Sequence, residues 1–229
     1  MNEAIIEKIA RMRPLLYHFT RVANLPSIIS SDRLLSANSL HPCGPDNRRT
    51  QPVEILHPAG IAILNPHLRI ADSMMAEGVS QEDFRSWLNR HVFFWPTVRD
   101  CLQMLEVYRR REPNSRFCVL ALDTRLLLAA HYANIRLTRY DSGSSPRFPH
   151  RCSYRKSPEL FLPLHQFGSS TRADTPASVP EIKEVLADGR VTGIAQLLRV
   201  IYIQPGEELP DSWSRLRRPL EDLQPPTRP

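Results

Sequence analysis

Residues 16–29 read LYHFTRVANLPSII, a short apolar strand that runs into the start of a helix. Alternation along the strand places His18 and Thr20 on one face, and Tyr17 and Phe19 on the other. A lone histidine in a strand is more often a core residue than a ligand-binding one. Two polar side chains on one face, however, can present an imidazole N–H and a hydroxyl together to a ribose or phosphate oxygen. The stretch therefore raises the question of whether His18 lines a binding site.

The composition predicts a folded domain: 41% of the 229 residues are hydrophobic, enough for a sizeable core. The chain has no apolar run of the about 18 residues that a membrane span needs. Residues 1–16 mix acids and bases through their apolar positions, which predicts an amphipathic helix rather than a signal peptide. We therefore expect a cytoplasmic protein without a membrane partner. The net charge of +6 favours polyanionic partners such as nucleic acid or phosphorylated ligands.

The four cysteines are widely separated, without a C-x-x-C motif or a histidine pair at metal-binding spacing. We expect no structural metal. Cys101 and Cys118 stand in apolar runs, which predicts buried thiols rather than disulfide partners. Cys43 and Cys152 are the thiols in polar surroundings, and they leave a Cys–His protease as an alternative that no other motif supports.

Short strands alternate irregularly with helices, without a regular βαβ rhythm, which predicts a mixed α+β fold. The domain is expected to span 1–204. The Pro-rich remainder, 205–229, is expected to be a poorly ordered tail, because five of the 21 prolines follow position 209. Helices are expected at 2–13, from 25 with Asn24 as N-cap, from 81, at 98–111 and at 124–133. Strands are expected at 15–20, 52–64 (one strand or a hairpin), 91–96, 116–123, 134–140, 159–167 and 181–191 (ending in a turn). Residues 194–203 are expected to form a short helical turn and then a closing strand.

Two sets of charged residues are candidates for chemistry. Arg48 and Arg49 lie in a polar loop, where a guanidinium fork suits the oxygens of a pyrophosphate, although a solvated charge pair is the simpler reading. Glu181 and Glu184 lie in a strand-like segment, and Glu159 competes with them. Motifs of other enzyme classes are missing from the sequence, namely G-x-S-x-G, H-E-x-x-H and the two common phosphate loops.

The order of these segments resembles the ADP-ribosyltransferase superfamily, and within it the DarT-type nucleic-acid ADP-ribosyltransferases. The quoted segments are YHFTRVANLPSII (17–29), NRR (47–49), HVFFWPT (91–97) and KEVLADGRVTGI (183–194). The chain also resembles a related, uncharacterised bacterial domain family with the same HVFFWP and SG-loop features. The resemblance covers about residues 15–203. It implies two small antiparallel sheets, flanked by helices, around a cleft that binds NAD.

The resemblance also implies roles for individual residues. Glu184 would be the catalytic acid/base, and Arg49 would hold the pyrophosphate or the acceptor, with Arg48 as the alternative. A carboxylate there would stabilise the oxocarbenium character that develops on the ribose as nicotinamide departs. The implied cofactor-binding residues are His18, Thr20, Tyr17, Asn24 and Arg48.

The resulting hypothesis is transfer of ADP-ribose from NAD to a nucleobase of DNA or RNA, or to a protein side chain, with release of nicotinamide. A toxin or defence role, with an antitoxin partner, would suit such an enzyme. The first alternative is a catalytically inactive nucleotide- or nucleic-acid-binding domain of the same fold. RNA 2′-phosphotransferase chemistry, which shares the fold, would need more Arg and His phosphate ligands at fixed spacing than the chain supplies.

Overall fold

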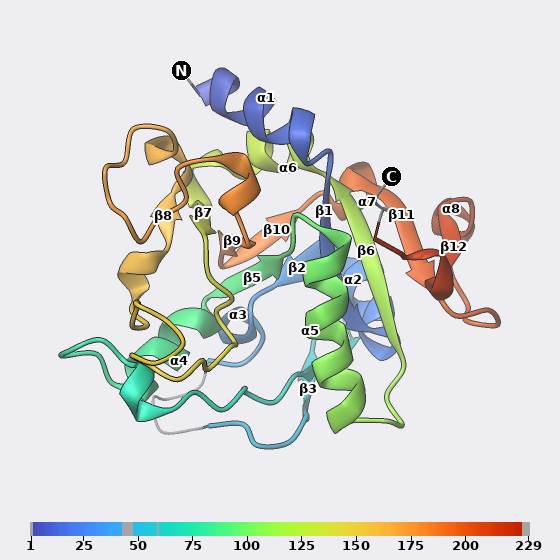
Figure 1. The fold of residues 1–229 in the computed structure, drawn as a ribbon. Coiled ribbons are helices and arrows are strands. Elements are labelled where there is room, and N and C mark those ends of the chain that lie inside the picture. Colours follow the sequence, from blue (N-terminus) through green and yellow to red (C-terminus); the bar gives the residue numbers. More distant parts are fainter. Residues whose placement is uncertain (1, 43–47, 59, 226–229) are drawn as a thin grey trace.

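The computed structural model describes residues 2–42, 48–58 and 60–225 (Figure 1). Helices and strands alternate irregularly along the chain, as the α+β prediction requires. The α-helices are α1 (Asn2–Met12), α2 (Leu25–Ser31), α3 (Ala37–Leu40), α4 (Gln81–Asn89), α5 (Val98–Arg111), α6 (Thr124–His131), α7 (Ile194–Leu197) and α8 (Asp211–Ser214). The strands are β1 (Leu15–Arg21), β2 (Arg33–Leu35), β3 (Val53–His57), β4 (Gly60–Leu64), β5 (His91–Phe94), β6 (Phe117–Asp123), β7 (Ile135–Thr138), β8 (Leu162–Pro163), β9 (Glu184–Asp188), β10 (Arg190–Thr192), β11 (Leu198–Ile203) and β12 (Arg217–Pro219).

The strands form two four-stranded sheets and two smaller pairs. The first sheet has the order β1-β6-β11-β12, and the second has the order β5-β9-β7-β8. The hairpin β3–β4 and the pair β2–β10 stand beside them. Every pairing in the two larger sheets is antiparallel except that of β11 with β12, which is parallel. The two larger sheets agree with the expected antiparallel pairing except at this edge, and of the two smaller pairs only the β3–β4 hairpin was among the expectations.

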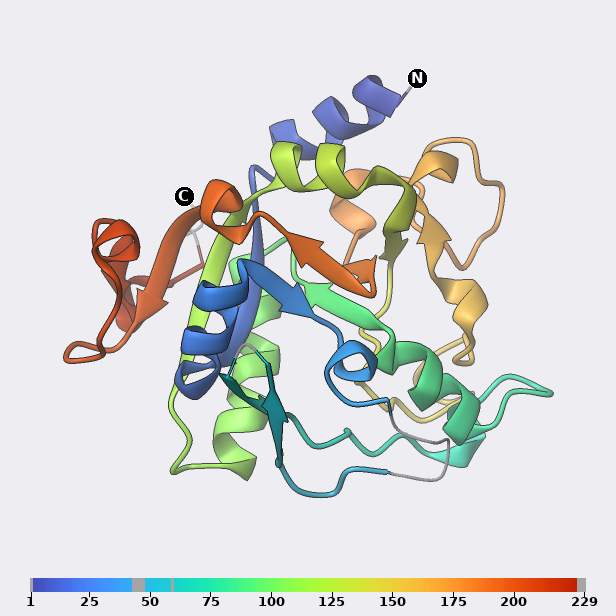
Figure 2. The ribbon, with the colours of Figure 1, turned by 180° about the vertical axis from the view of Figure 1, so that it is seen from behind.

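The inner strand β6 of the first sheet is apolar and buried on both faces. In β6, the residues from Phe117 to Leu122 are all buried. Helix α5 covers one face with Cys101, Met104, Leu105 and Tyr108, while α2 and α7 lie on the opposite side (Figures 1 and 2). Continuous apolar runs of this kind are expected where a strand is covered twice.

Helix starts follow the predicted capping residues closely. The Ser80 hydroxyl accepts a hydrogen bond from the Asp83 N–H at the start of α4, and Thr97 accepts one from the Asp100 N–H at the start of α5. Such caps satisfy backbone donors that the first turn leaves unpaired. Both predicted helix starts are confirmed.

The two large sheets meet where β1 approaches β5. The backbones of Tyr17 and Trp95 exchange two hydrogen bonds, with N···O distances of 2.9 and 2.8 Å. One residue further along β1, the His18 side chain bonds to the Phe93 carbonyl oxygen at 2.8 Å. These contacts place the histidine of the opening stretch at the junction of the sheets.

Two sequence expectations about individual segments need correction. The segment 159–167 is mostly 3₁₀ turns, and only Leu162–Pro163 pairs as a strand. Asn24 occupies the N-cap position of α2 but makes no side-chain cap, because its amide bonds to β4 and to Thr20 instead.

The chain after residue 204 is also more ordered than expected. As far as residue 225 it contributes α8 and β12, and it buries Trp213, Leu220 and Leu223. The prolines limit the length of these elements without preventing them, since three apolar side chains in the tail find a place against the first sheet and its neighbours.

Candidate functional site

A pocket of about 250 Å³ opens where the two sheets meet. Its lining includes His18 and Thr20 of β1, Glu184 of β9 and Arg49 of the segment before β3. Apolar side chains such as Leu35, Phe93, Trp95 and Met104 complete much of the wall. The structure thus brings into one pocket residues from three distant parts of the sequence: His18 and Thr20 of β1, Arg49, and Glu184.

His18 is held as a neutral imidazole with a defined tautomer. A carbonyl oxygen only accepts hydrogen bonds, so the 2.8 Å contact with Phe93 requires the hydrogen on Nδ1. Burial lowers the pKa of His18 to about 4. At neutral pH the ring therefore has Nε2 as an acceptor, and its N–H is already used. This corrects the expectation that His18 presents an N–H to a ribose or phosphate oxygen, because the only N–H of the neutral ring is bonded to the Phe93 carbonyl.

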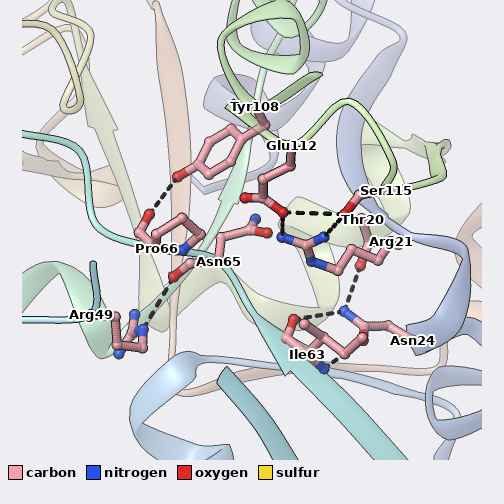
Figure 3. A network of polar contacts seen from close by, with 10 residues as sticks. All are labelled: Thr20, Arg21, Asn24, Arg49, Ile63, Asn65, Pro66, Tyr108, Glu112 and Ser115. Carbon is pink, nitrogen blue, oxygen red and sulfur yellow. Dashed lines mark hydrogen bonds and ion pairs between the residues drawn. The ribbon is translucent and has the colours of Figure 1, made fainter. Parts of the chain in front are cut away.

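Thr20 and Asn24 are joined to each other and to the β3–β4 hairpin (Figure 3). Asn24 Nδ2 donates to Thr20 Oγ1 at 3.2 Å and to the Ile63 carbonyl at 3.1 Å, and Asn24 Oδ1 accepts from the Ile63 N–H at 2.7 Å. Both polar ends of the amide are thereby occupied. Asn24 lines the pocket, and its bonds fix the hairpin that forms one wall.

Glu184 begins β9 and is 1% exposed. Ser142 donates to it twice: its N–H to Oε2 and its hydroxyl to Oε1, both at 3.2 Å. Burial, reinforced by the nearby Asp141 carboxylate, raises the pKa of Glu184, while the Ser142 bonds and Lys156 act in the opposite direction. The site contains a buried carboxyl group whose charge depends on its immediate neighbours.

Arg49 enters the pocket from another wall and is fixed by several bonds. Its Nε donates to the Asn65 carbonyl at 3.1 Å, and one terminal nitrogen donates to Asn89 Oδ1 at 2.9 Å (Figure 3 shows the Asn65 contact). The Arg49 backbone N–H donates to His67 Nδ1 at 2.9 Å, and the other ring nitrogen contacts Asn89 Oδ1 at 2.9 Å. Burial and the neighbouring Arg49 charge lower the pKa of His67 to about 4. The result is a cation in a defined position, supported by a neutral histidine.

Two further predicted site residues do not line this pocket. Tyr17 packs on the opposite face of β1, in the cluster with Phe19 and Trp95, and burial raises its pKa to about 12. Arg48 is exposed and lies outside the pocket lining. Glu181 and Glu159 are also elsewhere, in ion pairs with Arg139 and Arg172 respectively. Of the three candidate glutamates, Glu184 is the one in the pocket.

Several residues of the pocket were not predicted from the sequence. Ser142 and Gly143 come from the loop after β7, and His67, Arg85, Asn89 and His91 come from the segments around α4. The DSGSS sequence at 141–145 was available as a signal, because a turn rich in Gly and Ser can present backbone N–H groups to a carboxylate.

The three cysteines that the structure describes do not line this pocket. Cys101 and Cys118 are buried free thiols, as expected, and Cys152 contacts Met74 and the Tyr154 carbonyl. Cys43 and Asn47 lie outside the described residues. Within the described residues, no group of His, Cys, Asp and Glu has the arrangement to hold a metal ion. Over the same residues, helices long and apolar enough to span a membrane are absent.

The chain belongs to DUF7002, a family of unknown function, whose model matches residues 14–198. Among the curated proteins no match is found. Among solved structures, the chain is similar to DarT of Thermus sp. 2.9 in three complexes. The complex with NAD+ is 14% identical with a TM-score of 0.39, over 85% of this chain and 83% of that one. The complex with carba-NAD+ is 16% identical with a TM-score of 0.40, over 85% and 84%. The complex with ADP-ribosylated ssDNA is 15% identical with a TM-score of 0.39, over 85% and 83%.

Proposed function

We propose that the protein is an NAD-dependent ADP-ribosyltransferase and that Glu184 is its catalytic residue. The observation that carries this proposal is the meeting of Glu184, His18 and Arg49 in one pocket, each from a different part of the chain. These are the residues that the motif resemblance singles out. A pocket wall with one carboxylate, one neutral acceptor and one fixed guanidinium is suited to a ligand with a cationic ring, ribose hydroxyls and a diphosphate.

Each group has a distinct task in the proposed reaction. Arg49 binds a pyrophosphate oxygen, and the Nε2 atom of His18 accepts a hydrogen bond from a ribose hydroxyl. The apolar wall, with Phe93 and Trp95, accommodates the nicotinamide ring. This arrangement would hold the cofactor with its anomeric carbon near Glu184, which is a contribution through positioning.

The proposed bond changes are those of a substitution at the anomeric carbon. The bond from C1′ to the nicotinamide nitrogen breaks, and its electron pair stays on that nitrogen. The Glu184 carboxylate stabilises the positive charge that develops on the ribose. The nucleophile of the acceptor forms the new bond to C1′, and its proton passes to the same carboxylate. Binding of the cationic nicotinamide ring would lower the pKa of Glu184, and so favour the carboxylate form that this step requires.

The acceptor is proposed to be a nucleobase, with a protein side chain as the second choice. The net charge of +6 supports a polyanionic acceptor. The motif resemblance to the DarT-type branch points in the same direction.

A catalytically inactive nucleotide- or nucleic-acid-binding domain is the second candidate function. The specific observation in its favour is the burial of Glu184, which raises the pKa of this group and favours its protonated form. A protonated carboxyl group could bind a ligand but could not accept the proton of a nucleophile.

An activity assay separates the two functions. The protein would be incubated with labelled NAD and single-stranded DNA, RNA or a cell lysate, and the label in the macromolecular fraction measured. We expect transfer by the native chain and its loss in Glu184→Gln. The matched controls Glu181→Gln and Glu159→Gln, which alter surface ion pairs, should retain transfer. Binding of NAD without transfer or nicotinamide release would support the inactive domain. Loss of transfer in a control variant but not in Glu184→Gln would show that the catalytic glutamate is the one changed in that control.

A further inference from the structure

Lys156 is a buried lysine close to the proposed site. Lys156 is 1% exposed, and its Nζ donates to the carbonyls of Asp141 and Ser142 at 2.7 and 2.8 Å. Its backbone is fixed as well, because its N–H donates to the Met74 carbonyl at 2.6 Å and its carbonyl accepts from the Ala76 N–H at 3.0 Å. A lysine is rarely buried to this degree without a partner of opposite charge.

The segment that Lys156 holds is the one that contacts Glu184. Asp141 Oδ1 accepts from the N–H groups of Gly143 and Ser144 at 2.8 and 3.0 Å, which shapes a tight turn. Ser142, inside this turn, donates its N–H and its hydroxyl to the two Glu184 oxygens. The ammonium group and the carboxylate are thus joined through one residue, with Lys156 on the carbonyl side of Ser142.

Charge links the two groups in addition to these contacts. Burial raises the pKa of Glu184 and lowers that of Lys156, since both charged forms lose hydration. The attraction between the two charges opposes both shifts, while the Asp141 carboxylate raises both pKa values. The pocket lining also contains the charged Arg49 and Arg85, together with His18, which is neutral at pH 7.

We propose that Lys156 is a positioning residue that acts through Ser142: its ammonium group fixes the 141–144 turn and supplies a positive charge that favours the ionised form of Glu184. This inference rests on the proposed function for its catalytic meaning, although the charge relationship exists without it. A purely structural side chain would not need a charge, because methionine has a similar length and fills such a space without the cost of burying an ammonium group.

The test is a titration of the Glu184 carboxyl carbon by 13C NMR, with the signal assigned through its loss in Glu184→Gln. The protein needs only to be folded, so the measurement does not depend on NAD or on activity. Lys156→Met should move the midpoint to higher pH, because it removes the positive charge of Lys156, which lowers the pKa of Glu184. Asp141→Asn keeps the oxygen that accepts from Gly143 and Ser144 but removes a negative charge, and should move the midpoint to lower pH. Lys156→Arg keeps the positive charge and should leave the midpoint close to that of the native chain.

The outcomes separate this inference from the proposed function. Opposite shifts in Lys156→Met and Asp141→Asn support it even if no variant transfers ADP-ribose, in which case the proposed function alone fails. A lower melting temperature in Lys156→Met with an unmoved midpoint would show a structural role and overturn it. If Lys156→Met does not fold, Lys156→Gln removes the same charge and keeps two N–H donors. An unmoved Glu184 midpoint in Lys156→Gln would likewise overturn the inference. If transfer of ADP-ribose is observed, the acidic limb of the pH–rate profile should move to higher pH in Lys156→Met and Lys156→Gln.

Discussion

The Nδ1–H of His18 donates to the carbonyl of Phe93, 2.8 Å away, and so joins a side chain of one large sheet to the backbone of the other. This bond has two consequences. It orients the ring at the junction of the sheets, where the pocket opens. It also leaves Nε2 as an acceptor in a neutral ring, because burial lowers the pKa to about 4.

The pH dependence of stability should report the burial of His18. Its unfolded-state pKa is 6.5 and its folded-state pKa is about 4, so the unfolded chain binds a proton on this residue first as the pH falls. The residue therefore costs stability as the pH decreases from about 6.5 to about 4. Glu184, whose pKa is raised, acts with the opposite sign. Comparing variants isolates the histidine from the glutamate.

The free energy of unfolding should decrease from pH 7 to pH 5 by a smaller amount in His18→Gln than in the native chain. The difference between the two decreases should be up to about 2 kcal/mol. Urea denaturation at the two pH values measures this difference. The exposed His150 gives a control, His150→Gln, which should keep the native pH dependence. Equal pH dependence in His18→Gln and the native chain would contradict a buried neutral histidine.

Asn24 should stabilise the protein through the hairpin rather than through the helix that it precedes. Its amide makes three hydrogen bonds, two of them to the backbone of Ile63. Asn24→Ala leaves these backbone groups without partners, and we expect a loss of about 1–3 kcal/mol in the free energy of unfolding. The exposed Asn38 provides the control Asn38→Ala, for which a change within about 0.5 kcal/mol is expected. Equal effects of the two substitutions would argue against the role of Asn24.

Arg49 and Arg48 should differ in their effect on NAD binding. Arg49 lines the pocket and is oriented by Asn65 and Asn89, whereas the neighbouring Arg48 is exposed. A charge-assisted hydrogen bond contributes about 1.5–3 kcal/mol, so Arg49→Ala should weaken NAD binding by roughly 10- to 100-fold in Kd. Isothermal titration calorimetry with NAD measures both variants. If Arg48→Ala weakens binding as much as Arg49→Ala, the assignment of the pyrophosphate-binding residue would be wrong.

The C-terminal segment should contribute to stability, contrary to the sequence expectation. Trp213 is 4% exposed and packs in the same cluster as the strands of the first sheet. Trp213→Ala should lower the free energy of unfolding by about 3–5 kcal/mol, the usual cost of removing a large buried aromatic side chain. Gln224→Ala, at an exposed position of the same segment, is the control. A native-like urea midpoint for Trp213→Ala would contradict a stabilising role of this segment and would agree with the expected poorly ordered tail.

Local patterns were sufficient to predict most helices and strands. Ser80, Thr97 and Asp123 each cap a helix through the predicted side-chain bond, and the apolar run of β6 becomes a central strand. The parallel pairing of β11 with β12 was not predictable in this way, because the β12 sequence, two arginines and a proline, has no strand pattern of its own. The same holds for Asn24, whose sequence position favours a cap but whose amide bonds to the backbone of Ile63.

The site was predictable only as far as motifs reach. His18, Arg49 and Glu184 could be named because each lies in a recognisable segment. Lys156 could not, since a lysine before Ser157 and Pro158 carries no local signal of burial, and the only signal for Ser142 was the Gly- and Ser-rich sequence around it. Their importance arises from the fold, which closes the 141–158 loop over the first residue of β9.

The release of nicotinamide from NAD, measured by chromatography for the native chain, Glu184→Gln and Glu181→Gln in parallel, tests the central claim most directly. We predict release by the native chain and by Glu181→Gln, and a reduction of at least about 100-fold in Glu184→Gln, the scale on which a group that stabilises transition-state charge contributes. Release by Glu184→Gln at the native rate would contradict the assignment of Glu184 as the catalytic residue.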